Sequence, residues 1–131
     1  MINAKDLLER AKQAAASAHC PYSKFAVGAA VVWDDGTIDV GANVENASSP
    51  LGVCAERTAI ATGVCRSERQ LIMIAVWADV DQVVTPCGGC RQVMLEFAPD
   101  DLAELQVILG GRDQMRITNL ALLLPDAFRS Y

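Results

Sequence analysis

Residues 71–90 read LIMIAVWADVDQVVTPCGGC, and this stretch decides how the chain folds. The unbroken apolar run from Leu71 to Ala78 predicts a central strand that is covered on both faces. After a loop, the residues from Gly88 to about Ala98 predict a helix. The stretch therefore joins a buried strand to a helix whose first turn carries two cysteines, Cys87 and Cys90.

Helical and strand patterns alternate through the rest of the chain. The expected elements are a helix capped by Asn3 and ended by Pro21, a hairpin of strands 25–33 and 37–44, a helix over 54–65, a strand over 105–109, and a short strand over 114–117 followed by a turn capped by Thr118. This order predicts one domain over residues 1–131, an α/β fold built as a three-layer α/β/α sandwich with a mixed β-sheet.

Composition and charge narrow the function classes. The chain has 131 residues and a formal net charge of −5, and its lysines and arginines are scattered. We expect no nucleic-acid partner, because such proteins carry a basic patch or stripe, and a neutral small molecule fits better. The N-terminus has no signal-peptide core and no apolar run is long enough to span a bilayer, so we expect no membrane partner and a cytoplasmic location.

The cysteines indicate metal binding rather than a disulfide framework. There are five, an odd number, and no secretion signal accompanies them. Cys54, Cys87 and Cys90 all lie where helices begin, which predicts three thiolate ligands that converge off the helix ends. A structural zinc site has four protein ligands, whereas a catalytic one keeps three and leaves a position for water. Glu56, two residues after Cys54, is the expected proton carrier beside that open position.

Electrostatics at the helix starts supports this reading. Zinc with three thiolates carries a formal charge of −1, which opposes ionisation of a bound water. The two helix N-termini offset this charge in part. Arg57 is the adjacent cation, and we expect it to donate hydrogen bonds to the thiolates.

Plainer interpretations exist for several of these residues. The three thiols form a structural site if His19, Cys20 or Cys65 supplies a fourth ligand. We expect instead that Cys65 is a buried core thiol and that His19 is a surface residue near the end of the first helix. Arg91 is equally compatible with a solvated helix position and with a site residue.

At this point the sequence resembles a known family. The motifs that carry the resemblance are Cys54-Ala55-Glu56-Arg57, Pro86-Cys87-x-x-Cys90, the stretch from Pro21 to Ala30, Asn43-Val44-Glu45-Asn46-Ala47, and Leu123-Leu124-Pro125-x-x-Phe128. They resemble the cytidine deaminases, specifically the small homotetrameric type with three cysteine zinc ligands. The resemblance covers almost the whole chain. Related deaminases of a nucleoside-like antibiotic or of a polynucleotide are the alternative.

The resemblance implies a reaction and a role for each site residue. It implies one Zn²⁺ per subunit and hydrolysis of cytidine and deoxycytidine to uridine or deoxyuridine plus ammonia, in pyrimidine salvage. The implied roles are Phe25 against the pyrimidine ring, Asn43 and Glu45 on the ribose hydroxyls, the Ala55 backbone on the base, Glu56 as proton carrier, and Ala47 and Phe128 reaching the sites of neighbouring subunits of a homotetramer. One departure is Ser49, where members of the family usually have Tyr.

Overall fold

A five-stranded mixed sheet forms the centre of the protein. The computed structural model describes residues 1–130. The strands are β1 (Val27–Trp33), β2 (Ile38–Ala42), β3 (Leu71–Ala78), β4 (Gln106–Gly110) and β5 (Met115–Asn119). They lie in the order β2-β1-β3-β4-β5, with β3 and β4 parallel and the other neighbours antiparallel. The mixed sheet predicted from the sequence is confirmed.

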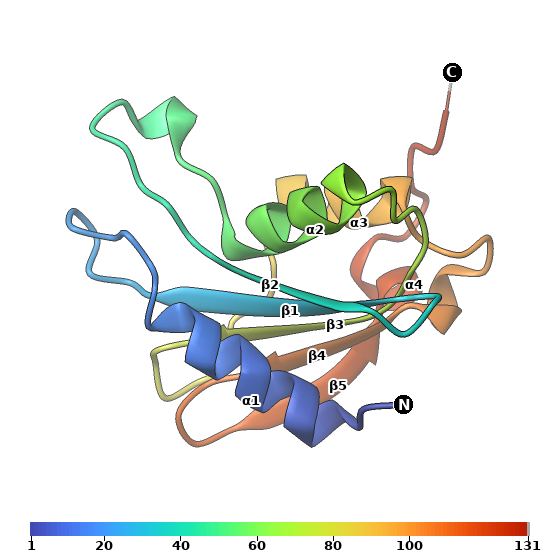
Figure 1. Ribbon diagram of the computed structural model, residues 1–131, viewed down its shortest axis with the longest axis horizontal. Coiled ribbons are helices and arrows are strands. Elements are labelled where there is room, and N and C mark those ends of the chain that lie inside the picture. The colour runs from blue at the N-terminus through green and yellow to red at the C-terminus, as the bar shows by residue number, and fades with distance from the viewer. Residues whose placement is uncertain (131) are drawn as a thin grey trace.

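Helices cover both faces of this sheet. They are α1 (Ala4–Ala15), α2 (Ala55–Cys65), α3 (Gly88–Glu96) and α4 (Leu120–Leu123), with short 3₁₀ turns η1 (Ser49–Leu51) and η2 (Leu102–Glu104). Helix α1 lies on one face, and α2 and α3 lie side by side on the other (Figure 1). Together these form the predicted three layers. No helix within residues 1–130 has the length and apolar character to cross a membrane.

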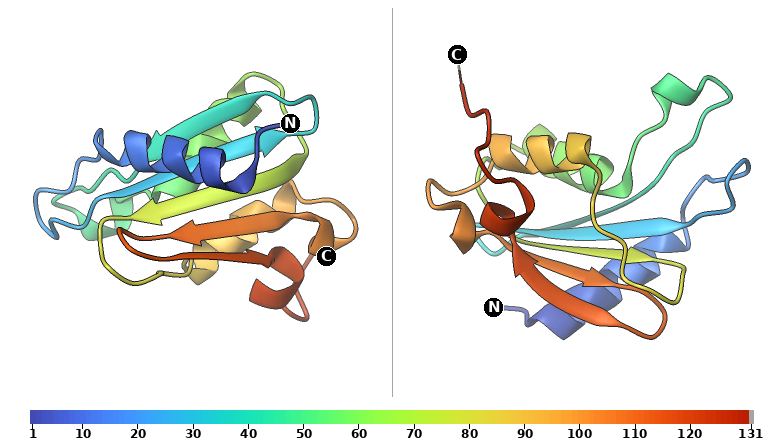
Figure 2. Two further views of the ribbon diagram at one scale, coloured as in Figure 1. Left: turned by 90° about the horizontal axis from the view of Figure 1, so that it is seen from below. Right: turned by 180° about the vertical axis from the view of Figure 1, so that it is seen from behind.

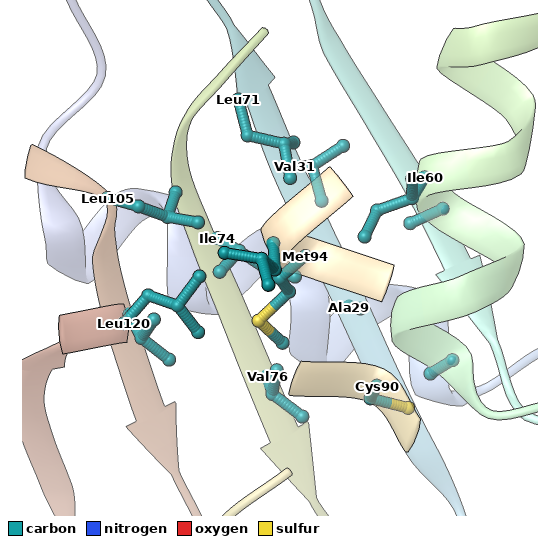
Figure 3. Packing of buried hydrophobic residues seen from close by; sticks show 14 of the residues in the cluster. Ala29, Val31, Ile60, Leu71, Ile74, Val76, Cys90, Met94, Leu105 and Leu120 are labelled. Atoms are coloured by element: carbon teal, nitrogen blue, oxygen red, sulfur yellow. The ribbon is translucent and has the colours of Figure 1, made fainter. Parts of the chain in front are cut away.

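The central strand β3 explains why the layers hold together. Ile74 and Val76 face the α2 and α3 side, whereas Ala75 and Trp77 face α1. Both sets are buried, so the unbroken apolar run does lie in a strand covered on both faces. Met94 of α3 packs over this strand in the larger core (Figure 3).

Close approach of helices to the sheet depends on small residues. A Cβ on Gly28 of β1 would lie 1.9 Å from the Ala11 carbonyl oxygen of α1. A Cβ on Gly41 of β2 would lie 2.5 Å from the Ala59 amide of α2. These distances leave no room for a side chain at either position, so α1 lies directly against β1 and α2 lies directly against β2.

Two predictions, one near each end of the chain, differ from the structure. Helix α1 ends at Ala15, so His19 does not lie at its end. The His19 backbone instead accepts from the Glu45 amide at 2.7 Å and donates to the Asn43 carbonyl at 2.9 Å, and these bonds take it out of the helix. At the other end of the chain, Asn119 and not Thr118 caps α4, because the Asn119 side chain reaches the Leu122 amide at 3.0 Å.

The prediction that Cys65 is a buried core thiol is wrong. Cys65 is exposed. Gly63, two residues earlier, faces the core, where a Cβ would lie 2.3 Å from the Trp33 ring. Residues two apart on a helix point in different directions, so Cys65 faces away from the core.

Candidate metal centre and active site

Three thiols meet where α2 and α3 begin. Cys54 and Cys87 are the N-cap residues of the two helices, and both have extended backbone conformations. Their side chains therefore project off the helix ends, where Cys90, from the first turn of α3, joins them. The three sulfur atoms lie within 4.8 Å of one another.

The geometry and the donor set fit zinc. Cys54 Sγ and Cys87 Sγ are 4.0 Å apart. Tetrahedral zinc with bonds of about 2.3 Å places its sulfur ligands about 3.8 Å apart. Within residues 1–130 neither His19, Cys20 nor Cys65 belongs to this cluster, so it offers three protein ligands and not the four of a closed structural site.

The protonation of the thiols also suits a cation. Burial raises the pKa of the Cys54 and Cys90 thiols, and the charge of Glu56 adds to the rise at Cys90. At Cys87 the backbone N–H of Cys90 donates a hydrogen bond that holds the pKa below its usual value. A divalent cation at the centre of the cluster favours deprotonation of all three thiols, because its charge offsets theirs.

Glu56 lies beside this cluster in the first turn of α2. It is 4% exposed, and burial raises the pKa of its carboxyl group. The rise is opposed in part by hydrogen bonds from its own backbone N–H and from the Cys90 thiol. A buried carboxyl group with a raised pKa, next to a metal position, has the properties of a proton carrier.

A pocket of about 230 Å³ opens in front of Glu56. Its walls come from the hairpin, from the starts of α2 and α3, and from the end of β3: Phe25, Val27, Asn43, Cys54, Ala55, Glu56, Val76, Val84, Thr85, Pro86 and Cys87. This volume is below the range of about 300–1,000 Å³ typical of drug-sized ligands. The pocket therefore suits a small ring.

Asn43 fixes the side of the pocket that carries Phe25. Its Oδ1 accepts from the Val27 amide at 2.9 Å, and its Nδ2 donates to the Phe25 carbonyl at 2.8 Å. These bonds hold the backbone on both sides of Ala26. Phe25, which is half-buried, is thereby placed in the pocket wall.

Glu45 lies beyond the pocket wall, against the loop that leads to Phe25. Its Oε1 accepts from the amides of Tyr22 at 3.1 Å and Ser23 at 3.2 Å. Hydrogen bonds from Ser23 and Tyr22 hold the pKa of the Glu45 carboxyl below its usual value. Ser23 in turn accepts from the Phe25 amide at 3.0 Å, so Glu45 is connected to the pocket through this loop.

The remaining predicted residues, Arg57, Ala47 and Phe128, do not line the pocket in front of Glu56. Arg57 is exposed and borders an apolar groove between α2 and α3, and in the described chain its guanidinium forms no hydrogen bond with a thiol. Ala47 is exposed on the loop that projects from the end of the sheet (Figure 1). Phe128 is 59% exposed, on the C-terminal segment that runs past α3 (Figure 2).

Arg91 takes part in the site although the sequence left its role open. Its Nε donates to the Pro86 carbonyl at 2.7 Å and its Nη1 donates to the Leu123 carbonyl at 2.7 Å. The signal available in the sequence was its position four residues after Cys87, which places it above the start of α3.

Comparison with known proteins decides the family. A profile of the cytidine and deoxycytidylate deaminase zinc-binding region matches residues 1–104. The chain belongs to this deaminase family. The cytidine deaminase of Halalkalibacterium halodurans is 45% identical over 123 residues, which cover 93% of this chain and 91% of that one. The cytidine deaminase of Mycobacterium tuberculosis is 42% identical over 118 residues, covering 90% of this chain and 84% of that one.

Solved structures agree with this deaminase assignment. The crystal structure of cytidine deaminase from Burkholderia pseudomallei superposes with a TM-score of 0.89 at 42% identity, over 97% of this chain and 100% of that one. The deaminase fold is thus shown, and the chain is an enzyme of the hydrolase class. The family is a zinc-binding one, and the cluster of three thiols fits that cofactor.

Proposed function

We propose that this deaminase hydrolyses cytidine and deoxycytidine to uridine or deoxyuridine plus ammonia, and that it serves pyrimidine salvage. The observation that carries the proposal is the buried Glu56 carboxyl between a three-thiol cluster and a pocket of about 230 Å³. The pocket accommodates one heterocyclic ring, and the relatives at 41–45% identity named cytidine deaminase support cytosine as that ring.

In the proposed reaction Glu56 moves the protons. Zinc, when held by Cys54, Cys87 and Cys90, supplies a water that is nucleophilic at neutral pH. Glu56 accepts a proton from the water that adds to C4 of the base and delivers a proton to N3. It then takes the proton of the new C4 hydroxyl group and passes it to the exocyclic amine, so that the C4=O double bond forms as the C4–N bond breaks and ammonia leaves. Burial suits Glu56 to this work, because a raised pKa brings a carboxyl group closer to the operating pH.

Phe25, Asn43, Glu45 and Ala55 are the proposed substrate-binding residues. Phe25 lies against the pyrimidine ring, and the Ala55 backbone at the start of α2 contacts the base, because N–H groups in the first turn of a helix lack partners within it. Asn43 and Glu45 bind the ribose hydroxyls. The Asn43 amide group has two N–H donors, of which the bond to Phe25 uses one.

We further propose a homotetramer in which neighbouring subunits complete each site. Ala47 and Phe128 are the residues that reach the neighbouring pockets, and both are exposed. The loop that holds Ala47 projects from the end of the sheet. The apolar groove between α2 and α3, about 380 Å³ in volume, is a further surface available for subunit contact. Ser49, on the projecting loop, offers no aromatic ring there.

The net charge of the chain supports a nucleoside substrate in this proposal, and the state of its cysteines supports a cytoplasmic location. A net charge of −5 disfavours a nucleic-acid substrate, so the ligand is a free nucleoside. All five cysteines are free thiols, which suits the reducing cytoplasm.

The direct test follows the ultraviolet absorbance of cytidine mixed with zinc-loaded protein. We expect the spectrum to convert to that of uridine and ammonia to appear in equal amount. Free cytosine should react far more slowly, because a site built to pair hydroxyl groups rejects analogues that lack them. Zinc-loaded protein that leaves cytidine and deoxycytidine unchanged would rule out the proposed reaction. Equal efficiency on cytosine would rule out the roles of Asn43 and Glu45.

A further inference from the structure

Arg91 holds both peptide groups that flank Cys87. Its backbone amide donates to the Cys87 carbonyl at 3.0 Å, and its side-chain Nε donates to the Pro86 carbonyl at 2.7 Å. The Pro86 carbonyl belongs to the peptide plane before the Cys87 Cα, and the Cys87 carbonyl belongs to the plane after it. Because peptide groups are planar, the two bonds together restrict φ and ψ at Cys87, and with them the direction of the Cα–Cβ bond that carries its thiol.

Cys54, the other N-cap ligand, is held differently. The Val53 carbonyl before it accepts from the Val44 amide at 2.9 Å, and the Cys54 carbonyl accepts from the amides of Arg57 and Thr58 at 3.1 Å. These bonds are all between backbone groups and survive a change of side chain. Cys90 is fully buried within α3. Cys87 is thus the ligand whose orientation depends on another residue's side chain.

The guanidinium of Arg91 is itself anchored at a second point. Its Nη1 donates at 2.7 Å to the carbonyl of Leu123, the last residue of α4. Carbonyl groups at the end of a helix lack partners within it, so this bond satisfies one of them. Arg91 is half-buried and spans the two carbonyls with its planar group, which a flexible lysine ammonium does not reproduce.

The next residue ties down the C-terminal segment independently. Gln92 Nε2 donates to the Phe128 carbonyl at 2.9 Å. Among residues 1–130, the Gln92 side chain forms no hydrogen bond with the loop before Cys87, whereas the Arg91 side chain bonds both that loop and α4. Variants of the two neighbours therefore separate two effects, since Arg91, and not Gln92, bonds both the loop before Cys87 and the end of α4.

We propose that Arg91 is a positioning residue for the metal centre: it fixes the backbone of Cys87 by bracing the Pro86 carbonyl against the end of α4. The proposal rests on the proposed function only in taking Cys54, Cys87 and Cys90 as zinc ligands. Pro86 also lines the pocket, so the same brace keeps one pocket wall in place.

The test compares Arg91→Ala, Arg91→Lys and Gln92→Ala with the parent protein. Zinc affinity is measured by competition with a chromogenic chelator, and ligand geometry by the visible absorption of the Co²⁺-loaded protein. We expect Arg91→Ala to bind zinc about 10–100-fold more weakly, the usual effect of losing a residue that orients a metal ligand. Its Co²⁺ bands should shift or weaken. Arg91→Lys should lie between Arg91→Ala and the parent, and Gln92→Ala should stay within about twofold of the parent.

Two outcomes would overturn the assignment. One is an Arg91→Ala variant with parental zinc affinity and a superposable Co²⁺ spectrum. The other is an equal loss in Gln92→Ala, which would assign the effect to docking of the C-terminal segment. If circular dichroism shows that Arg91→Ala does not fold, Arg91→Lys is compared with Gln92→Ala and the parent protein instead. Zinc affinity and the Co²⁺ spectrum do not depend on turnover. A protein that binds zinc but has no deaminase activity would refute the proposed function, and the comparison of zinc affinities would still test the role of Arg91.

Discussion

Asp39 bonds both Trp33 and Arg66 at the C-terminal end of α2, and this clamp allows a quantitative prediction. Asp39 of β2 is 9% exposed, and its Oδ2 accepts both from Trp33 Nε1 at 2.9 Å and from Arg66, the C-cap residue of α2. Asp39→Ala leaves the buried Trp33 N–H without its partner, which costs about 1–3 kcal/mol of unfolding free energy. The Arg66 side chain is 45% exposed, so its ion pair with Asp39 is screened by water and adds little.

Thermal and urea unfolding measure this loss. A loss of about 2 kcal/mol should lower Tm by roughly 6–10 °C for a domain of this size. Asp79→Ala is the matched control, because Asp79 is 50% exposed and pairs at 3.7 Å with Arg112, which is 53% exposed. That variant should melt with the parent protein. An Asp39→Ala variant no less stable than Asp79→Ala would show that the Trp33 bond contributes nothing.

The same variant should keep its active site. Helix α2 has 11 residues, so its two ends lie about 16 Å apart. The thiol of Cys54 and the carboxyl of Glu56 are at the opposite end from Asp39. We therefore expect zinc content and turnover of Asp39→Ala to stay within about twofold of the parent well below its Tm. A large loss of turnover at such temperatures would show that the clamp also positions the site.

Four further predictions concern the site and its surroundings. Glu56→Gln should retain fold and zinc but lose turnover by about 10²–10⁴-fold, because it removes the proton carrier; more than a tenth of the parental rate would contradict that role. Arg57→Gln should lower turnover more than substrate affinity if Arg57 tempers the charge of the thiolates, and parental turnover with full zinc content would show that the helix ends suffice. Phe128→Ala should raise the KM for cytidine and weaken subunit association in sedimentation, whereas an unaffected variant would exclude composite sites. Glu45→Gln should flatten the acid limb of the stability profile, which is the fall in unfolding free energy at low pH. The folded-state pKa of Glu45 is lowered from 4.5, so its contribution to the unfolding free energy is present above that pH and is lost as the pH falls below it. An unchanged limb would show that the bonds to Ser23 and Tyr22 do not stabilise the fold.

The metal motif was readable because it is local. Cys54 and Cys87 immediately precede helices, and the capping position sends each side chain off the helix end. Short spacings within one helical turn place Glu56 and Cys90 with almost no dependence on the rest of the fold. The apolar run of β3 likewise predicts its own burial, because a strand with no polar face must be covered on both sides.

Errors arose where the outcome depends on contacts between distant segments. Cys65 was expected in the core because it is an apolar thiol on a helix, but the approach of Gly63 to Trp33 decides which face of α2 is covered. The helix before His19 ends early because the backbone of His19 pairs with residues 43–45, which the local pattern does not contain. Asn119 caps α4 in place of Thr118 since its side chain is the one within reach of the Leu122 amide.

What the sequence determined by itself is the chemistry: three thiols and one carboxyl at helix starts, within a layered α/β chain of net charge −5. Only the tertiary structure decided what holds those groups in place. Asn43 reaches the Phe25 carbonyl across 18 residues of chain, and Arg91 reaches the Leu123 carbonyl across 32. A periodic pattern reports which face of an element is apolar. It does not report which distant carbonyl a polar side chain will meet, because that depends on how the elements pack.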